Sequence, residues 1–126
     1  MKTRQGAQLK KVFLSLFIVS AFIATIFAQN NVIYLVKVEG IINPATAGYI
    51  VKGIDKAEKD GASCLVIQLD TPGGLMESMR SIVKRMLTAQ IPIIVYVAPS
   101  GSRAGSAGVF ITMAAHIAAM APGTNI

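Results

Sequence analysis

From Val32 onward, the chain alternates short apolar runs with longer segments that are apolar on one side only. Three runs rich in branched aliphatic residues predict strands at 32–39, 64–69 and 93–97. Between them, apolar positions recur at helical spacing, with charged residues on the opposite side. Strands that alternate with helices through short connections predict an α/β fold with repeated β-α units and a mainly parallel sheet.

Several positions carry signals for the ends and surroundings of these elements. Asn43 followed by Pro44 predicts the start of the first helix, and Gly61 predicts its end. The run 64–69 is almost wholly apolar, so we expect this strand to be buried on both faces of the sheet. Residues 117–121 are predicted to form a fourth short strand rather than to continue the preceding helix.

The first 28 residues have a different composition. They begin with basic residues and no acid (Lys2, Arg4, Lys10 and Lys11), and the run 12–28 then contains no charge, Gly or Pro. This pattern predicts a secretory signal peptide cleaved after Ala28. The alternative is an uncleaved membrane anchor, although a helix of about 25 Å is short for a hydrocarbon core of roughly 30 Å. In both cases residues 29–126 form the domain, and we expect it to be exported.

The net charge of +6 belongs largely to this N-terminal segment. Without its four basic residues, eight basic residues face six acidic ones, which leaves about +2. No basic stripe is interleaved with aromatic residues, so nucleic acid is not an expected partner. Cys64 is the only cysteine and lies in an apolar run, so neither a disulfide within the chain nor a zinc cluster is expected. We predict no metal and no cofactor.

Two glycine-containing turns carry the candidate chemistry. The first, Asp70-Thr-Pro-Gly-Gly74, follows the second strand, and Ser106 sits in the second, Arg103-Ala-Gly-Ser-Ala-Gly108, at the start of a helix. Loops that follow parallel strands meet at one edge of the sheet. A serine hydroxyl there is a candidate nucleophile, and backbone N–H groups of the two turns are candidate donors to an oxyanion.

Other readings of these residues are open. Ser106 is also typical of a helix N-cap. Asp70 is consistent with two roles, which are stabilising its own turn and acting as an acid catalyst. His116 is the only histidine, but one helix between it and Ser106 would separate them by about 15 Å. Arg103 stays protonated and cannot act as a base. The base is therefore not evident in these residues.

Three motifs occur in order after residue 68: Leu69-Asp-Thr-Pro-Gly-Gly-Leu75, Pro99-Ser-Gly-Ser-Arg-Ala-Gly-Ser-Ala-Gly108, and Met113-Ala-Ala-His-Ile-Ala-Ala-Met-Ala-Pro-Gly-Thr-Asn-Ile126. Together they resemble the NfeD family of membrane-bound serine proteases, also called stomatin operon partners. This family lies within the ClpP/crotonase superfamily, so a ClpP/crotonase-like fold is implied. The resemblance covers residues 32–126.

The resemblance implies a Ser–Lys dyad and a role for each matching residue. Ser106 resembles the nucleophile, and the N–H groups of Gly74 and Ala107 resemble the oxyanion donors. Gly73, Gly74 and Leu75 resemble the substrate-binding segment, where a peptide would add as a strand. The family lysine would lie beyond Ile126. The chain is therefore expected to be an N-terminal fragment, inactive alone, of a protein that also has membrane helices and a small β-barrel domain.

The leading hypothesis is an exported, membrane-associated serine endopeptidase that cleaves apolar segments of membrane proteins. A polypeptide substrate, a stomatin-like membrane protein and further copies of the chain are its expected partners. Two alternatives are a non-catalytic scaffold for a stomatin-like protein and a crotonase-like acyl-CoA enzyme. An α/β-hydrolase is disfavoured, because 104–108 only half matches the nucleophile elbow and no acid and histidine follow.

Overall fold

The computed structural model describes residues 10–11, 13–17 and 32–126. The chain divides after Asn30 into two units, and the fold below is that of the second. Most of the predicted signal segment, residues 1–28, lies outside the described residues, so its cleavage stays a prediction. Among the residues that are described, none belongs to a helix that is long and apolar enough to cross a membrane.

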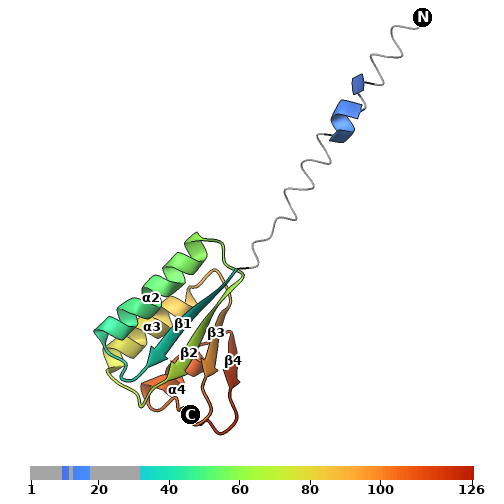
Figure 1. Cartoon of the computed structure of the whole chain (residues 1–126). Helices are drawn as coiled ribbons and strands as arrows, with labels where there is room; N and C mark the ends of the chain where they lie inside the picture. The colour runs from blue at the N-terminus through green and yellow to red at the C-terminus, as the bar shows by residue number, and fades with distance from the viewer. Residues whose placement is uncertain (1–9, 12, 18–31) are drawn as a thin grey trace, which may run out of the picture. The chain divides into compact units, whose positions relative to one another are not determined.

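Strands and helices alternate along the whole of the second unit (Figure 1). In chain order the elements are β1 (Ile33–Glu39), α2 (Pro44–Lys59), β2 (Cys64–Asp70), α3 (Met76–Leu87), β3 (Ile93–Val97), α4 (Ala107–Met113) and β4 (Ile117–Met120). The predicted order is confirmed, and so is the fourth strand, which is shorter by one residue than the predicted run 117–121.

The four strands form one sheet in the order β1-β2-β3-β4, and every neighbouring pair is parallel. On β2, Ile67 lies opposite Val36 of β1 and Val95 of β3. The predicted α/β class with a parallel sheet is therefore confirmed. Because all strands run the same way, the loops that follow β2 and β3 leave the sheet at the same edge.

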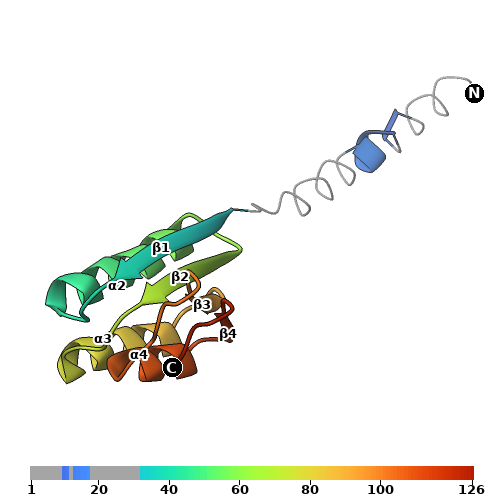
Figure 2. The ribbon, with the colours of Figure 1, turned by 60° about the horizontal axis from the view of Figure 1, so that its bottom comes forward.

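The core lies between one face of the sheet and the three helices, with α3 beside both α2 and α4 (Figure 2). Alternate strand residues point into it, and the large side chains that are fully buried there are Ile42, Ile50, Ile54, Leu65, Ile67, Leu69, Ile82, Met86, Ile93, Ile111, Val95 and Val97. On β2 the residues between them, such as Val66 and Gln68, are only half-buried. The expectation that β2 is buried on both faces was therefore wrong, because the helices cover one face only.

The ends of α2 form as the sequence predicts. Asn43 is its N-cap, and the Asn43 side chain accepts a hydrogen bond from the Thr46 N–H at 2.9 Å. Pro44 occupies the first helical position, where no N–H is needed. Gly61 follows the last turn with φ +65°, a left-handed conformation that favours glycine. These two ends determine where the chain enters β2.

Helices α2 and α3 are joined by a half-buried arginine. Arg85 on α3 donates to Asp55 at 2.8 Å and to Glu58 at 2.6 Å, both on α2. Glu58 also accepts a hydrogen bond from the Gln90 N–H at 2.7 Å. The hydrogen bond from Arg85, followed by that from Gln90, holds the pKa of Glu58 below its usual range. The ion pairs of Arg85 with Asp55 and Glu58 therefore tie α3 to α2.

Candidate active site

The loops after β2 and β3 are paired to one another beyond the carboxyl edge of the sheet. Thr71 and Ala104 form an isolated parallel bridge. The Thr71 N–H donates to the Arg103 carbonyl at 2.7 Å, and the Gly105 N–H donates to the Thr71 carbonyl at 2.9 Å. The two glycine turns of the sequence are therefore neighbours in space, as expected from their positions after parallel strands.

Ser106 lies directly against Gly73. Gly73 has φ +118°, and a Cβ atom built on it would lie 2.6 Å from Ser106 Cβ and 3.1 Å from Ser106 Oγ. Real Cβ contacts are not that short, so any side chain at position 73 would displace the serine. A glycine is needed here both for the backbone conformation and for the close approach of the hydroxyl.

A glycine is needed at position 74 for another reason. Its Cα faces the backbone of Ile42, in the loop between β1 and α2, and a Cβ there would lie 2.0 Å from the Ile42 carbonyl oxygen. Ile42 pairs with this segment: its N–H donates to the Gly73 carbonyl, and its carbonyl accepts from the Leu75 N–H, each at 2.8 Å. One edge of the Gly73–Leu75 segment is therefore taken, and an added peptide strand has only the other edge available.

Ser106 has a backbone conformation that is unusual for a residue with a side chain. Its φ is +50° and its ψ is −109°, and among the described residues it is the one non-glycine with positive φ. The serine stands immediately before α4, yet its side chain makes no capping hydrogen bond. The alternative reading of Ser106 as an ordinary N-cap is therefore not supported. An exposed serine on a sharp turn into a helix is the geometry of nucleophile elbows.

Two backbone N–H groups beside Ser106 are available to a ligand. Within residues 32–126, neither the Gly74 N–H nor the Ala107 N–H takes part in a hydrogen bond. Gly74 follows the glycine that contacts Ser106, and Ala107 follows Ser106 itself at the first position of α4. The predicted oxyanion donors thus flank the serine, one from each loop, and each has its hydrogen unpaired.

Asp70 holds the two loops together instead of stabilising its own turn. One of its carboxylate oxygens accepts a hydrogen bond from the Arg103 N–H at 3.0 Å. A residue that closes its own turn would bond to a backbone group two or three positions further on. That local reading of Asp70 was wrong: the next loop lies close enough to offer its own N–H, and Pro72, two residues on, has none.

His116 lies at the opposite end of the sheet from Ser106. It precedes β4, and its Nδ1 accepts a hydrogen bond from the N–H of Ile93, the first residue of β3, at 3.1 Å. Ser106 instead follows the loop at the carboxyl end of β3. The imidazole therefore links the starts of two strands and lies away from Ser106, in agreement with the predicted separation of the two residues.

Exposed apolar side chains surround the glycine turn. Leu75, which is 56% exposed, is one of the three predicted substrate-binding residues, and Met76 beside it is also exposed. Ile41, next to the residue that pairs with Gly74, is exposed as well. Soluble proteins rarely leave such side chains clustered at the surface without a function.

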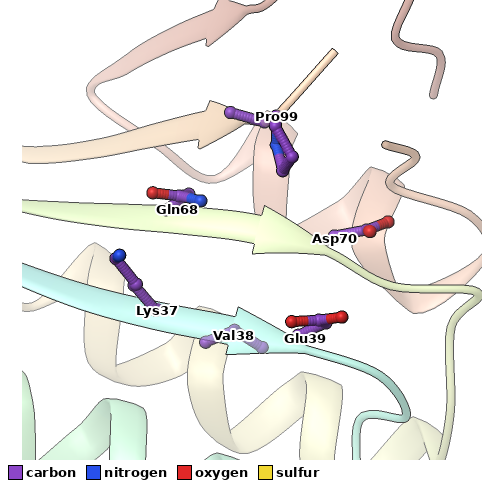
Figure 3. A pocket seen from close by; sticks show the side chains of 7 residues that line it. Lys37, Val38, Glu39, Gln68, Asp70 and Pro99 are labelled. Carbon is purple, nitrogen blue, oxygen red and sulfur yellow. The ribbon is translucent and has the colours of Figure 1, made fainter. Parts of the chain in front are cut away.

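A separate pocket of about 140 Å³ opens on the face of the sheet that the helices leave uncovered (Figure 3). Lys37 and Glu39 of β1, Gln68 and Asp70 of β2, and Pro99 after β3 line it. Glu39 and Asp70 are opposite one another in the parallel register. Asp70 begins the glycine turn, but Gly73, Gly74 and Ser106 do not line this pocket, so it is separate from the contact between the serine and the glycines.

Two residues of the site were not singled out from the sequence. Thr71 is fully buried, and its hydroxyl bonds to the backbone of Gly73. Its position two residues before a glycine in a turn is a local signal that was available. Ile42 had no such signal, because its pairing with Gly74 joins segments that are distant in sequence.

The parallel sheet with helices on one face, and the two paired loops beyond its carboxyl edge, form a fold of the ClpP-like class. A ClpP1 variant from Listeria monocytogenes has a TM-score of 0.66 at 23% identity, covering 71% of this chain and 52% of that one, which shows the fold alone. Residues 32–126 match the family model described as "NfeD1b, N-terminal domain". The chain belongs to the NfeD family, as the sequence motifs indicated.

Two characterised relatives have informative descriptions. The "Membrane-bound protease PH1510" of Pyrococcus horikoshii is 40% identical over 118 residues, which are 94% of this chain and 26% of that protein. The "Membrane protein NfeD1b" of Bacillus subtilis is 29% identical over 96 residues, 76% of this chain and 21% of that protein. The chain thus spans about a quarter of the length of these relatives.

The solved structures agree with this assignment. A serine-to-alanine variant of the 1510-N membrane-bound stomatin-specific protease has a TM-score of 0.74 at 41% identity, over 75% of this chain and 46% of that one. A lysine-to-alanine variant of the same protease, solved in complex with a substrate peptide, has a TM-score of 0.73 at 42% identity, over 75% and 43%. The resemblance of this chain is therefore to a serine peptidase.

Proposed function

We propose that this chain is the nucleophile-bearing part of an exported, membrane-associated serine endopeptidase that cleaves apolar segments of membrane proteins. The observation that carries the proposal is the contact between Ser106 and Gly73. A Cβ atom built on Gly73 would lie 3.1 Å from the Ser106 hydroxyl oxygen. This contact brings the serine next to the unpaired Gly74 N–H. An attacked carbonyl there would have both a nucleophile and a hydrogen-bond donor within reach.

In the proposed reaction, a base takes the proton of the Ser106 hydroxyl as Oγ attacks the scissile carbonyl. The base then gives this proton to the amine of the following residue, which leaves. The Gly74 and Ala107 N–H groups stabilise the negative charge that develops on the carbonyl oxygen. The resulting ester on Ser106 is then hydrolysed by water, which releases the acyl half of the substrate and restores the hydroxyl. Hydrogen bonds of the neighbouring residues Gly73, Leu75 and Gly108 hold the segments that carry both donors, so little reorganisation is needed during the reaction.

The base in this proposal is a lysine outside the chain. No lysine follows Lys84 in the sequence, and His116 lies at the other end of the sheet. A lysine in an apolar site has a lowered pKa and can take a proton from serine. The lysine-to-alanine variant of the related protease, bound to a substrate peptide, is consistent with this choice.

The substrate in this proposal is an extended, apolar stretch of a membrane protein, bound beside residues 73–75. The Ile42 side of this segment is already paired, so the peptide adds on the opposite edge. Leu75, Met76 and Ile41 provide exposed apolar surface for its side chains. A stomatin-like protein is a suitable partner, since the related protease is described as stomatin-specific. We also expect the full-length protein to assemble as a homo-oligomer.

The test compares Ser106→Ala with Ser100→Ala in the full-length protein. The substrates are internally quenched peptides rich in Val, Leu and Ala. We expect the wild type and Ser100→Ala to cleave them and Ser106→Ala to be inactive while remaining folded by circular dichroism. Equal cleavage by Ser106→Ala would contradict the assignment of the nucleophile. No cleavage by the wild type would contradict the proposal and favour the scaffold hypothesis.

A further inference from the structure

Thr71 is the residue that joins the two halves of the proposed site. It belongs to the glycine turn, forms a bridge with Ala104 of the serine loop and is fully buried. Its backbone pairs with the serine loop on both sides, through the Arg103 carbonyl at 2.7 Å and the Gly105 N–H at 2.9 Å.

The Thr71 hydroxyl contacts both polar backbone groups of one residue. Oγ1 accepts a hydrogen bond from the Gly73 N–H at 3.0 Å and donates to the Gly73 carbonyl at 3.2 Å. Together with the Ile42 N–H, which donates to the same carbonyl at 2.8 Å, these bonds fix the direction of the peptide plane that follows, and that plane carries the Gly74 N–H. A buried hydroxyl with both bonding functions satisfied is costly to replace.

The methyl group of Thr71 packs against the helix that begins at the serine. A Cβ built on Gly108 would lie 2.7 Å from Thr71 Cγ2. Gly108 is in the first turn of α4, which also carries the Ala107 N–H. The side chain thus contacts both segments that supply a candidate oxyanion donor.

We infer that Thr71 is a positioning residue of the proposed peptidase: its hydroxyl holds the Gly73–Gly74 peptide so that the Gly74 N–H points at the oxyanion. This inference rests on the proposed function for its effect on cleavage. The hydroxyl itself touches no substrate. Its removal should lower kcat, because the donor is misdirected in the transition state, and should leave KM nearly unchanged.

The experiment uses four variants of the full-length protein, three of them at Thr71. Thr71→Val removes the hydroxyl and keeps the branched shape. Thr71→Ser and Thr71→Ala both lack the methyl group and differ from one another only in the hydroxyl. Ser106→Ala is included as the test of the proposed function. Peptide cleavage is measured with the same apolar quenched peptides.

We expect Thr71→Val to lower kcat by about 10- to 100-fold with little change in KM. Thr71→Ser should restore most of the kcat that Thr71→Ala loses. Unchanged kcat in Thr71→Val, or equal losses in Thr71→Ser and Thr71→Ala, would overturn the inference. If Thr71→Val does not fold, the comparison of Thr71→Ser with Thr71→Ala decides whether the hydroxyl is needed.

Hydrogen exchange gives a second readout that does not depend on activity. The Gly73 N–H, measured by mass spectrometry in peptides spanning residues 71–75, should exchange faster in Thr71→Val and Thr71→Ala than in the wild type and Thr71→Ser. Equal exchange in all variants would overturn the role of the hydroxyl. Cleavage that survives in Ser106→Ala would instead contradict the proposed function, and the exchange comparison would still decide whether Thr71 holds the turn.

Discussion

Gly73 and Ser106 are in such close contact that a methyl group cannot be added to the glycine. The added carbon would lie 2.6 Å from Ser106 Cβ, and the left-handed φ of +118° at Gly73 would strain any side chain. The close contact joins two loops more than thirty residues apart in sequence.

Gly73→Ala should therefore lower kcat/KM of the full-length protein by about 100-fold or more, since small displacements of a nucleophile have effects of that size. The matched control is Gly48→Ala, because Gly48 lies in α2 with nothing within 4 Å of the added carbon. That control should cleave normally and be more stable by about 0.5–1 kcal/mol. Normal cleavage by Gly73→Ala would contradict the described contact.

The backbone of Ser106 should store strain that is measurable as stability. At φ +50° a side chain is unfavourable, whereas glycine adopts positive φ readily. We expect Ser106→Gly to have a free energy of unfolding about 1–2 kcal/mol higher than Ser106→Ala, although both lack activity. Chemical denaturation of the full-length protein measures the difference. Equal stabilities would indicate that Ser106 is unstrained.

Asp70 should act through its hydrogen bond to the Arg103 N–H rather than as an acid. Asp70→Asn keeps an oxygen acceptor and should retain activity with an unaltered pH profile. Asp70→Ala leaves the Arg103 N–H unpaired and should lose about 1 kcal/mol of stability. Steady-state kinetics and thermal unfolding test both variants. An Asp70→Asn variant as inactive as Ser106→Ala would indicate an acid catalyst instead.

The ion pair of Glu58 with Arg85 predicts a dependence of stability on pH. The pKa of Glu58 is below its ordinary value of 4.5, so its contribution is present above that pH and is lost as the pH falls through the lower, folded-state value. Glu58→Gln should therefore destabilise the protein at pH 7, and the difference from wild type should shrink below about pH 4.5. Thermal unfolding across this range measures it, and a constant difference would contradict the assignment.

Much of the fold was predictable because local patterns and tertiary packing agree. The branched apolar residues of β1, β2 and β3 and the Asn43-Pro44 start of α2 were recognisable directly. The burial of β2 was not, because it depends on which face of the sheet the helices cover. A strand that is apolar at almost every position, as β2 is apart from Gln68 and Asp70, gives little information about that choice.

The site was predictable in outline for a similar reason. Parallel strands place the loops that follow them at one edge of the sheet, so the proximity of Gly73 and Ser106 was predictable from the topology. The positive φ of Ser106 and the hydrogen bond from the Arg103 N–H to Asp70 were not predictable from the topology. Both arise from the pairing of the two loops, which no local pattern in either loop specifies.

The most direct test of Ser106 as a nucleophile is its covalent capture. The full-length protein is treated with a fluorophosphonate, whose phosphorus bonds to an activated serine oxygen as fluoride leaves, and the modified residue is located by tandem mass spectrometry. We predict a single adduct on Ser106 that is absent from Ser106→Ala and appears in parallel with the loss of peptide cleavage. An adduct on another serine such as Ser100, with cleavage lost in the same proportion, would contradict the assignment of Ser106.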